Sequence, residues 1–507
     1  MQFYGGAMLF HSIEFLAFFP IVVGIYLLIP KKLRYIWLLV ASYYFYMGWD
    51  AAYAVLIAVS TLITYACGIA LGQIQKKERR HSKLWRRLVV AAGVTSNLGI
   101  LMFYKYFTFF MDNINGIRAA MQMDAIPIRY DVLLPVGISF YTFQALGYVV
   151  DVYRGDTQAE KNPLKYALFV SFFPQLVAGP IERSGNLLRQ VSEVPEQKLL
   201  NYRRITKGLM VMVYGYLLKM VIADRVAIVV DEVFNHYWQY GTFELLLAAV
   251  GFSIQIYCDF GSYSLIAIGA AQVMGFTLME NFNAPYFATS IQDFWRRWHI
   301  SLSTWFRDYL YIPLGGNRKG KIRKYRNVLI TFLLSGFWHG ANWTYVVWGG
   351  LHGLYQVIGE VLMPIRKKVV QLGRVKTECE SYKLTQIAVT FCLTTLAWIF
   401  FRVETVEDGI AYIIRMCTRW NPWVLFDSSL YTLGVNRFQA NILFFALFLL
   451  FVTDLIRYRK GQRIDVFLES QNLWFRWIVL VVMIVMIVVY GAYGQVYDAK
   501  QFIYFQF

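Results

Sequence analysis

The sequence predicts an all-α protein that crosses a lipid bilayer many times. Of its 507 residues, 58% are hydrophobic and only 16% are charged, whereas an average soluble chain carries about 25% charged residues. The apolar residues gather into runs long enough to cross a hydrocarbon core about 30 Å thick. Because so apolar a chain lacks the polar side chains to cover a water-exposed surface, the composition excludes an ordinary soluble enzyme.

The candidate spans follow one another along almost the whole chain. We expect about eleven of them to cross the membrane. The stretch 164–178 contains Pro174 and ends at Gly179-Pro180, which favours a re-entrant or broken helix buried in protein. The apolar stretches are 13–29, 33–49, 52–74, 88–110, 132–150, 164–178, 209–229, 244–274, 327–347, 349–363, 384–402, 438–456 and 473–490.

Basic clusters separate the apolar stretches and predict the orientation of the chain. The formal net charge is +18, and membrane topology explains it better than nucleic-acid binding because cytoplasmic loops are rich in Lys and Arg. We therefore expect a multi-pass protein of the cell membrane with both termini extracytoplasmic, the first apolar run retained as a span, and 403–437 as the longest external loop. No internal repeat or long linker is visible, which predicts a single domain over 1–507. The clusters placed in the cytoplasm are 31–34, 76–87, 318–326, 366–376 and 457–463.

The stretch 292–314 resembles neither a span nor a loop. It reads QDFWRRWHISLSTWFRDYLYIPL, and Trp295, His299, Leu302 and Phe306 share one face at helical spacing. This pattern predicts an amphipathic interfacial helix with aromatic anchors. Two acidic residues and a histidine among the arginines exceed what anchoring requires.

His339 lies near the middle of the apolar stretch 327–347. A polar side chain at membrane depth is costly and by default marks a functional site; the alternative is a histidine that bonds a neighbouring helix as a packing residue. Gly336 and Gly340 flank it at helical spacing, which would let another backbone or a slender substrate approach closely. His352, thirteen residues later, is better explained by helix packing.

Several kinds of catalytic site are disfavoured. The five cysteines are scattered, and no histidine has metal-ligand spacing, so neither a zinc site nor a disulfide framework is predicted. The chain also lacks a GxSxG elbow and a Walker A loop. The chemistry that remains natural for an isolated buried histidine is proton transfer, in which a neutral imidazole takes a hydroxyl proton while the oxygen attacks an acyl carbon.

Four motifs together resemble the membrane-bound O-acyltransferase family, in the branch of the alginate O-acetylation membrane subunit and the teichoic acid D-alanine exporter. The resemblance covers the chain almost end to end, with the core motifs at about 132–355 and further spans and an aromatic tail at 384–507. The motifs are LPVGISFYTFQALGYVVDVYRG at 134–155, FFPQLVAGPIER at 172–183, NFNAPYFATSIQDFWRRWHISLSTWFRDYLYIPLGGNRKG at 281–320 and SGFWHGANWTYVVWGGLHG at 335–353.

The resemblance implies site residues and an architecture. His339 matches the family's essential histidine and His299 its second histidine, inside a ring of helices around a thin floor between a cytoplasmic and an external funnel. At Leu265 this chain lacks the usual acidic residue, so no role is assigned to a carboxylate there. Candidate residues of the substrate tunnel are Trp298, Trp338, Ser335, Asn342 and Gln144.

The implied activity is transfer of an acyl group from a cytoplasmic thioester to a hydroxyl of an extracellular polymer. The donor would be acetyl-CoA or an acyl carrier protein phosphopantetheine, no cofactor would be tightly bound, and an extracytoplasmic SGNH-type acyltransferase would be a partner. The chain length favours acetyl over D-alanyl transfer. A secondary transporter or flippase and a structural scaffold are the rival interpretations, and a carrier would be expected to place more carboxylates in its spans. Tyr504, in the tail, is a possible acyl acceptor, and an interfacial aromatic anchor is the alternative.

Overall fold

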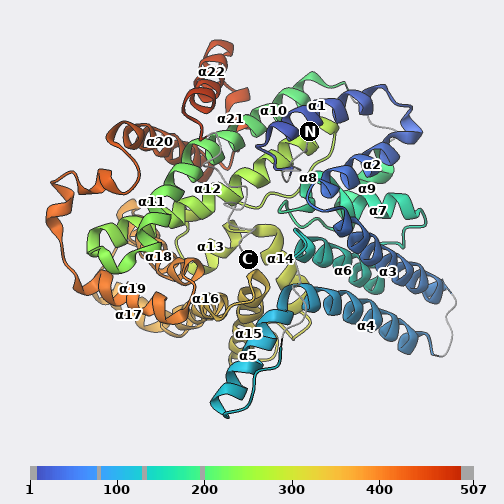
Figure 1. The fold of residues 1–507 in the computed structure, drawn as a ribbon, viewed down its shortest axis with the longest axis horizontal. Helices are drawn as coiled ribbons and strands as arrows, with labels where there is room; N and C mark the ends of the chain where they lie inside the picture. The colour runs from blue at the N-terminus through green and yellow to red at the C-terminus, as the bar shows by residue number, and fades with distance from the viewer. Residues whose placement is uncertain (1–7, 77–80, 128–133, 195–199, 493–507) are drawn as a thin grey trace. The chain divides into compact units, whose positions relative to one another are not determined.

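The computed structural model describes residues 8–76, 81–127, 134–194 and 200–492. All regular elements in these ranges are helices, drawn in chain order from the blue α1 to the red α22 in Figure 1. The chain forms two compact units. One comprises Met1–Met212 and Ile266–Met279, and the other comprises Val213–Leu265 and Glu280–Phe507. The all-α prediction is confirmed for the described residues, and the single-domain assignment stays a prediction.

In the described parts of the chain, six helices are long and apolar enough to cross a membrane, and each coincides with a predicted span. The helix α1 (Ile13–Leu28) is apolar but shorter. The six are α3 (Ala51–Lys76), the continuous run Ser82–Ala120 that contains α4 (Ser82–Leu101) and α5 (Phe107–Ala120), α12 (Thr242–Met274), α18 (Glu380–Arg402), α20 (Arg437–Lys460) and α22 (Leu473–Tyr490).

The first unit is built from helices that pack through aromatic side chains and small residues. Phe15, Phe18, Phe45 and Phe173 form a cluster with ring centroids 5.4 to 6.2 Å apart, and van der Waals packing of this kind holds helices together where the surrounding lipid is as apolar as the side chains. A Cβ at Gly68 of α3 would lie 2.5 Å from the Tyr148 hydroxyl of α6, so a larger residue there would require the Tyr148 ring to move. The other helices of this unit are α2 (Arg34–Met47), α6 (Ile138–Arg154), α7 (Pro163–Ser171), α8 (Phe173–Leu176) and α9 (Arg189–Glu193).

The predicted broken helix is present in the first unit. α7 ends at Ser171, and α8 starts at Phe173 after an extended Phe172. Asn162 caps α7 by accepting hydrogen bonds from the N–H groups of Leu164 and Lys165. Residues 168–178 are all buried, as irregular backbone at membrane depth requires.

The second unit contains both histidine motifs and the C-terminal helices. Helices α10 (Tyr202–Leu217) and α12 each begin in one unit and end in the other. The segment 403–437, expected as a loop, contains the helix α19 (Val406–Thr418). The remaining helices are α11 (Asp224–Asn235), α13 (Ile291–Arg297), α14 (Ile300–Phe306), α15 (Lys321–His339), α16 (Trp343–Val361), α17 (Met363–Leu372) and α21 (Ile464–Glu469), with π-helical turns η5 (Leu218–Ala223) and η8 (Arg307–Tyr311).

Candidate active site

His339 is the last residue of α15, and its side chain is buried. The helix ends there because Gly340 is extended, with φ of −161°, and because Asn342 caps the next helix by accepting from the Thr344 N–H at 3.0 Å. The expectation of one continuous span over 327–347 is therefore wrong, and Gly340 does not flank His339 at helical spacing. The chain reverses here, which places the imidazole at a helix end.

Gly336 behaves as predicted, since another backbone packs directly against it. A Cβ at this position would lie 2.2 Å from the carbonyl oxygen of Tyr345, and a Cβ at Gly349 would lie 2.3 Å from that of Phe332. Helices α15 and α16 lie side by side (Figure 1) and cross at this pair of glycines. Small residues are what allow two helix backbones to approach so closely.

His299 occupies the junction between α13 and α14 instead of the face of one amphipathic helix. Its φ and ψ are 42° and 53°, a left-handed conformation that L residues rarely adopt. The predicted single helix over 292–314 is therefore wrong, although Trp295, Leu302 and Phe306 are buried as expected. Burial lowers the pKa of His299 to about 3, so the imidazole is neutral at physiological pH.

The two histidines meet inside an aromatic cage. Their ring centroids are 6.3 Å apart, and Trp338 contacts both, at 4.9 Å from His339 and 6.2 Å from His299. Trp348 and Phe401 complete the surroundings of His339. Two adjacent imidazoles in an apolar enclosure can accept and return a proton with little competition from water.

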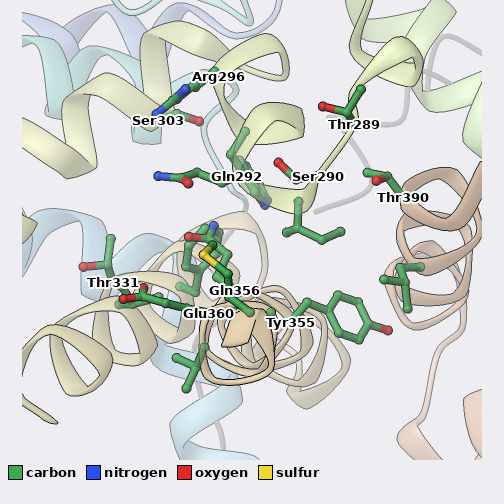
Figure 2. Close-up of a pocket in the computed structure, with 18 of the residues that line it drawn as sticks. Thr289, Ser290, Gln292, Arg296, Ser303, Thr331, Tyr355, Gln356, Glu360 and Thr390 are labelled. Carbon is green, nitrogen blue, oxygen red and sulfur yellow. The ribbon is translucent and has the colours of Figure 1, made fainter. Parts of the chain in front are cut away.

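A cavity of about 1210 Å³ extends over the same helices of this unit. Figure 2 shows its wall of Thr289, Ser290 and Gln292 opposite Gln356 and Glu360 of α16. Ser335 lines it, and because Ser335 precedes His339 by four residues on α15, the cavity wall comes within about 6 Å of the histidine along the helix axis. The cavity therefore offers room for a sizeable substrate next to the cage.

The cavity wall carries basic side chains. Lys324 pairs with Glu360, Arg307 pairs with Asp308, and Arg366 donates to the Tyr382 hydroxyl. With Arg296, four cationic groups line the wall. Such a surface favours a ligand with negative charge.

The other predicted tunnel residues have different surroundings. Trp298 is buried and stacks on Phe294 with ring centroids 5.4 Å apart. Asn342 acts as a helix cap and also donates to the Glu404 carbonyl. Gln144 belongs to the first unit, where its amide donates to the Phe169 carbonyl of α7. Tyr504 lies outside the described residues.

Sequence reasoning missed a buried charged cluster in the second unit. Lys219 of η5 lies 2.5 Å from Asp259 and 3.0 Å from Asp224, and each side chain is at most 4% exposed. Asp454 of α20 is a further buried carboxylate, and it accepts from the Tyr257 hydroxyl at 3.0 Å. The available signal was the presence of Lys219, Asp224 and Arg225 inside the apolar stretch 209–229.

His352 packs as predicted. It is fully buried, its Nδ1 accepts from the Trp295 indole N–H at 3.2 Å, and it stacks on Phe294. Within the described ranges, no three His, Cys, Asp or Glu side chains gather as metal ligands.

Comparison with known proteins defines the class. Residues 158–406 match the membrane-bound O-acyltransferase family, MBOAT. The chain is 40% identical over 401 residues to the probable alginate O-acetylase AlgI of Pseudomonas putida, covering 79% of this chain and 78% of that one. This chain belongs to the membrane-bound O-acyltransferase family and is an acyltransferase.

Two further relatives place the chain among the branches of the family. It is 35% identical over 413 residues to the peptidoglycan O-acetyltransferase of Helicobacter pylori, covering 77% of this chain and 74% of that one. It is 31% identical over 239 residues to the teichoic acid D-alanyltransferase of Bacillus subtilis, covering 43% and 57%. The similarity to the O-acetylating relatives thus extends over much more of the chain.

Proposed function

We propose that this protein transfers an acetyl group from a cytoplasmic thioester for O-acetylation of an extracellular polysaccharide. The observation that carries the proposal is the pair of buried imidazoles, 6.3 Å apart, next to a cavity large enough for a substrate. The O-acetylase names of the relatives that match over most of the chain favour acetyl over D-alanyl. Family membership favours an acyltransferase over the transporter and scaffold alternatives.

In the proposed mechanism His339 is the general base. Its neutral imidazole takes the proton of the accepting hydroxyl while that oxygen bonds to the thioester carbonyl carbon. Collapse of the tetrahedral intermediate breaks the C–S bond, and the imidazolium returns the proton to the leaving thiolate. His299 orients the reacting groups, and the apolar cage strengthens these polar interactions.

The donor is proposed to enter through the cavity. The positive groups on its wall suit the phosphates of acetyl-CoA or of a carrier protein's phosphopantetheine arm. Lys324 and Arg366 belong to the basic clusters 318–326 and 366–376, so the proposed orientation opens the cavity to the cytoplasm. Ser335, Trp338, Trp298 and Asn342 remain proposed tunnel residues in the second unit, and the role predicted for Gln144 of the first unit stays a prediction.

The proposal includes the finer architecture and the partners. About eleven spans would surround a thin floor between two funnels, in the cell membrane, with both termini extracytoplasmic. An extracytoplasmic SGNH-type acyltransferase would receive the acetyl group, directly or from Tyr504, and pass it to the polymer.

The test replaces His339 by Ala in the producing cells. We expect loss of base-labile acetate from the extracellular polysaccharide, with normal amounts of protein in the membrane, because the variant lacks the proposed base. His236→Ala, which changes a half-exposed histidine of the same unit, is the matched control and should keep acetylation. If His339→Ala cells carry as much acetate on the polysaccharide as the wild type, His339 is not the base. If the wild-type polymer releases D-alanine in place of acetate, the proposed acyl group is wrong.

A further inference from the structure

Residues Asn281 to Asn283 run beside the junction that carries His299. The Asn283 N–H donates to the Arg297 carbonyl at 2.9 Å, and the Ile300 N–H donates to the Asn281 carbonyl at 2.9 Å. These two bonds lie on either side of the Trp298-His299 pair. The backbone of the junction is therefore held at both ends by one short segment.

The side chain of Asn281 adds two more bonds. It is 1% exposed, its Nδ2 donates to the Ser264 hydroxyl at 2.7 Å, and its Oδ1 accepts from the Ser301 hydroxyl at 2.6 Å. An amide offers a donor at one end and an acceptor at the other, and here both ends are used. Asn281 thereby ties the first turn of α14 to α12.

The same face of α12 also contacts the histidine ring. Phe260 precedes Ser264 by one helical turn, and its ring centroid lies 4.6 Å from that of His299. Two contacts therefore hold the His299 region against α12. The Asn281 side chain joins the first turn of α14 to this helix, and Phe260 packs against the His299 ring.

We propose that Asn281 is the positioning residue that keeps His299 in its left-handed conformation, an inference that rests on the proposed role of His299 in acyl transfer. A left-handed φ is unfavourable for histidine and persists only where the surroundings hold it. Without the side-chain amide, the two main-chain bonds remain but α14 is no longer tied to α12, and the loosened junction relaxes towards a negative φ. That change rotates the imidazole away from His339.

A double-mutant cycle tests the inference, with base-labile acetate on the polysaccharide of the producing cells as the readout. Asn281→Ala should lower the acetylation rate by about 10- to 100-fold, because a displacement of about 1 Å has effects of this size. His299→Ala should lower it at least as much. The double variant should be no slower than His299→Ala, because Asn281 acts only through that histidine.

A buried Asn elsewhere provides the matched control. Asn97 in the first unit accepts from the Ser60 hydroxyl at 2.6 Å and is 1% exposed, so Asn97→Ala removes a comparable bond. Its effect should multiply with that of His299→Ala, as expected for independent sites.

The outcomes separate the inference from the proposed function. If Asn281→Ala and His299→Ala reduce the rate multiplicatively, the positioning role is wrong while the role of His299 stands. If His299→Ala acetylates like the wild type, the proposed function of His299 fails first, and the inference falls with it. If Asn281→Ala does not accumulate in the membrane, Ser264→Ala takes its place in the cycle, because it removes only the bond from Asn281 to α12. If the rate losses of Ser264→Ala and His299→Ala then multiply in the double variant, the inference is overturned.

Discussion

The position of His339 depends on how closely α15 and α16 cross at Gly336, so replacing this glycine should lower the acetylation rate. An alanine Cβ at Gly336 would lie 2.2 Å from the Tyr345 carbonyl oxygen, 3.0 Å from its carbonyl carbon and 3.2 Å from the Cα of Gly349. All three are backbone atoms and cannot rotate aside. Gly336→Ala therefore forces the two helices apart at a point three residues before His339.

The size of the effect follows from the overlap. Real Cβ atoms essentially never approach another heavy atom closer than 3.0 Å, so the backbones must separate by close to an ångström. A misplacement of about 1 Å costs roughly 100-fold in rate, and overpacking of this kind costs about 1–3 kcal/mol of stability. We expect Gly336→Ala to lose about 100-fold in acetylation while most of the protein still folds.

The assay compares Gly336→Ala with a matched control on the neighbouring helix. At Gly350 an added Cβ would meet only the Leu333 Cδ2, at an ordinary 3.4 Å, so Gly350→Ala should acetylate like the wild type. Thermal unfolding in detergent and membrane protein levels are measured alongside acetate release. Wild-type acetylation by Gly336→Ala at normal protein levels would refute the link between this crossing and the position of His339.

Two further predictions concern other parts of the chain. Tyr504→Phe keeps an aromatic ring and removes only the hydroxyl, so it should abolish acetate on the polymer if the tail accepts the acyl group; unchanged acetate would leave Tyr504 as an anchor. Burial raises the pKa of Glu182 from 4.5 to about 7, so the folded state binds this proton more tightly than the unfolded chain. The resulting stability, roughly 3 kcal/mol, is present below about pH 4.5 and lost as the pH rises through 7. Glu182→Gln should not show this loss of stability between about pH 4.5 and 7. If the unfolding temperatures of the wild type and the variant depend equally on pH, the raised pKa of Glu182 is contradicted.

The sequence predicted the parts of the fold that depend on local composition. Apolar runs of span length became the six long helices, and Pro174 marked the broken helix between α7 and α8 correctly. The prediction failed where distant residues decide the backbone. Helical spacing of Trp295, His299 and Leu302 indicated one helix, but the bond from the Ile300 N–H to Asn281 breaks it at His299, and no local pattern encodes that bond.

The candidate site shows the same division. His339 was identified from its place in an apolar stretch and by motif resemblance, and His299 by motif resemblance. The structure places them within one cage, but periodicity misplaced both: one at mid-span, the other on a helix face. A local pattern cannot show that Gly340 is extended, because Gly is compatible with either a helix or its end. Asn281 opens the motif at 281–320, and Lys219 and Asp454 lie inside predicted apolar stretches, but no local pattern indicated which residues they would bond.

The deep charges also weaken an argument made from sequence alone. Scarcity of carboxylates in the spans was taken to disfavour a transporter, yet Asp259, Asp224 and Asp454 are all buried. Their partners give them a structural explanation: Lys219 pairs with both Asp224 and Asp259, and the Tyr257–Asp454 bond joins α12 to α20. A bond between Tyr214 and Thr453 ties α10 to the same helix. Polar groups that hold helices together in this way need no transported ion. Buried charges therefore do not distinguish an acyltransferase from a transporter in this chain, whereas membership of the acyltransferase family does.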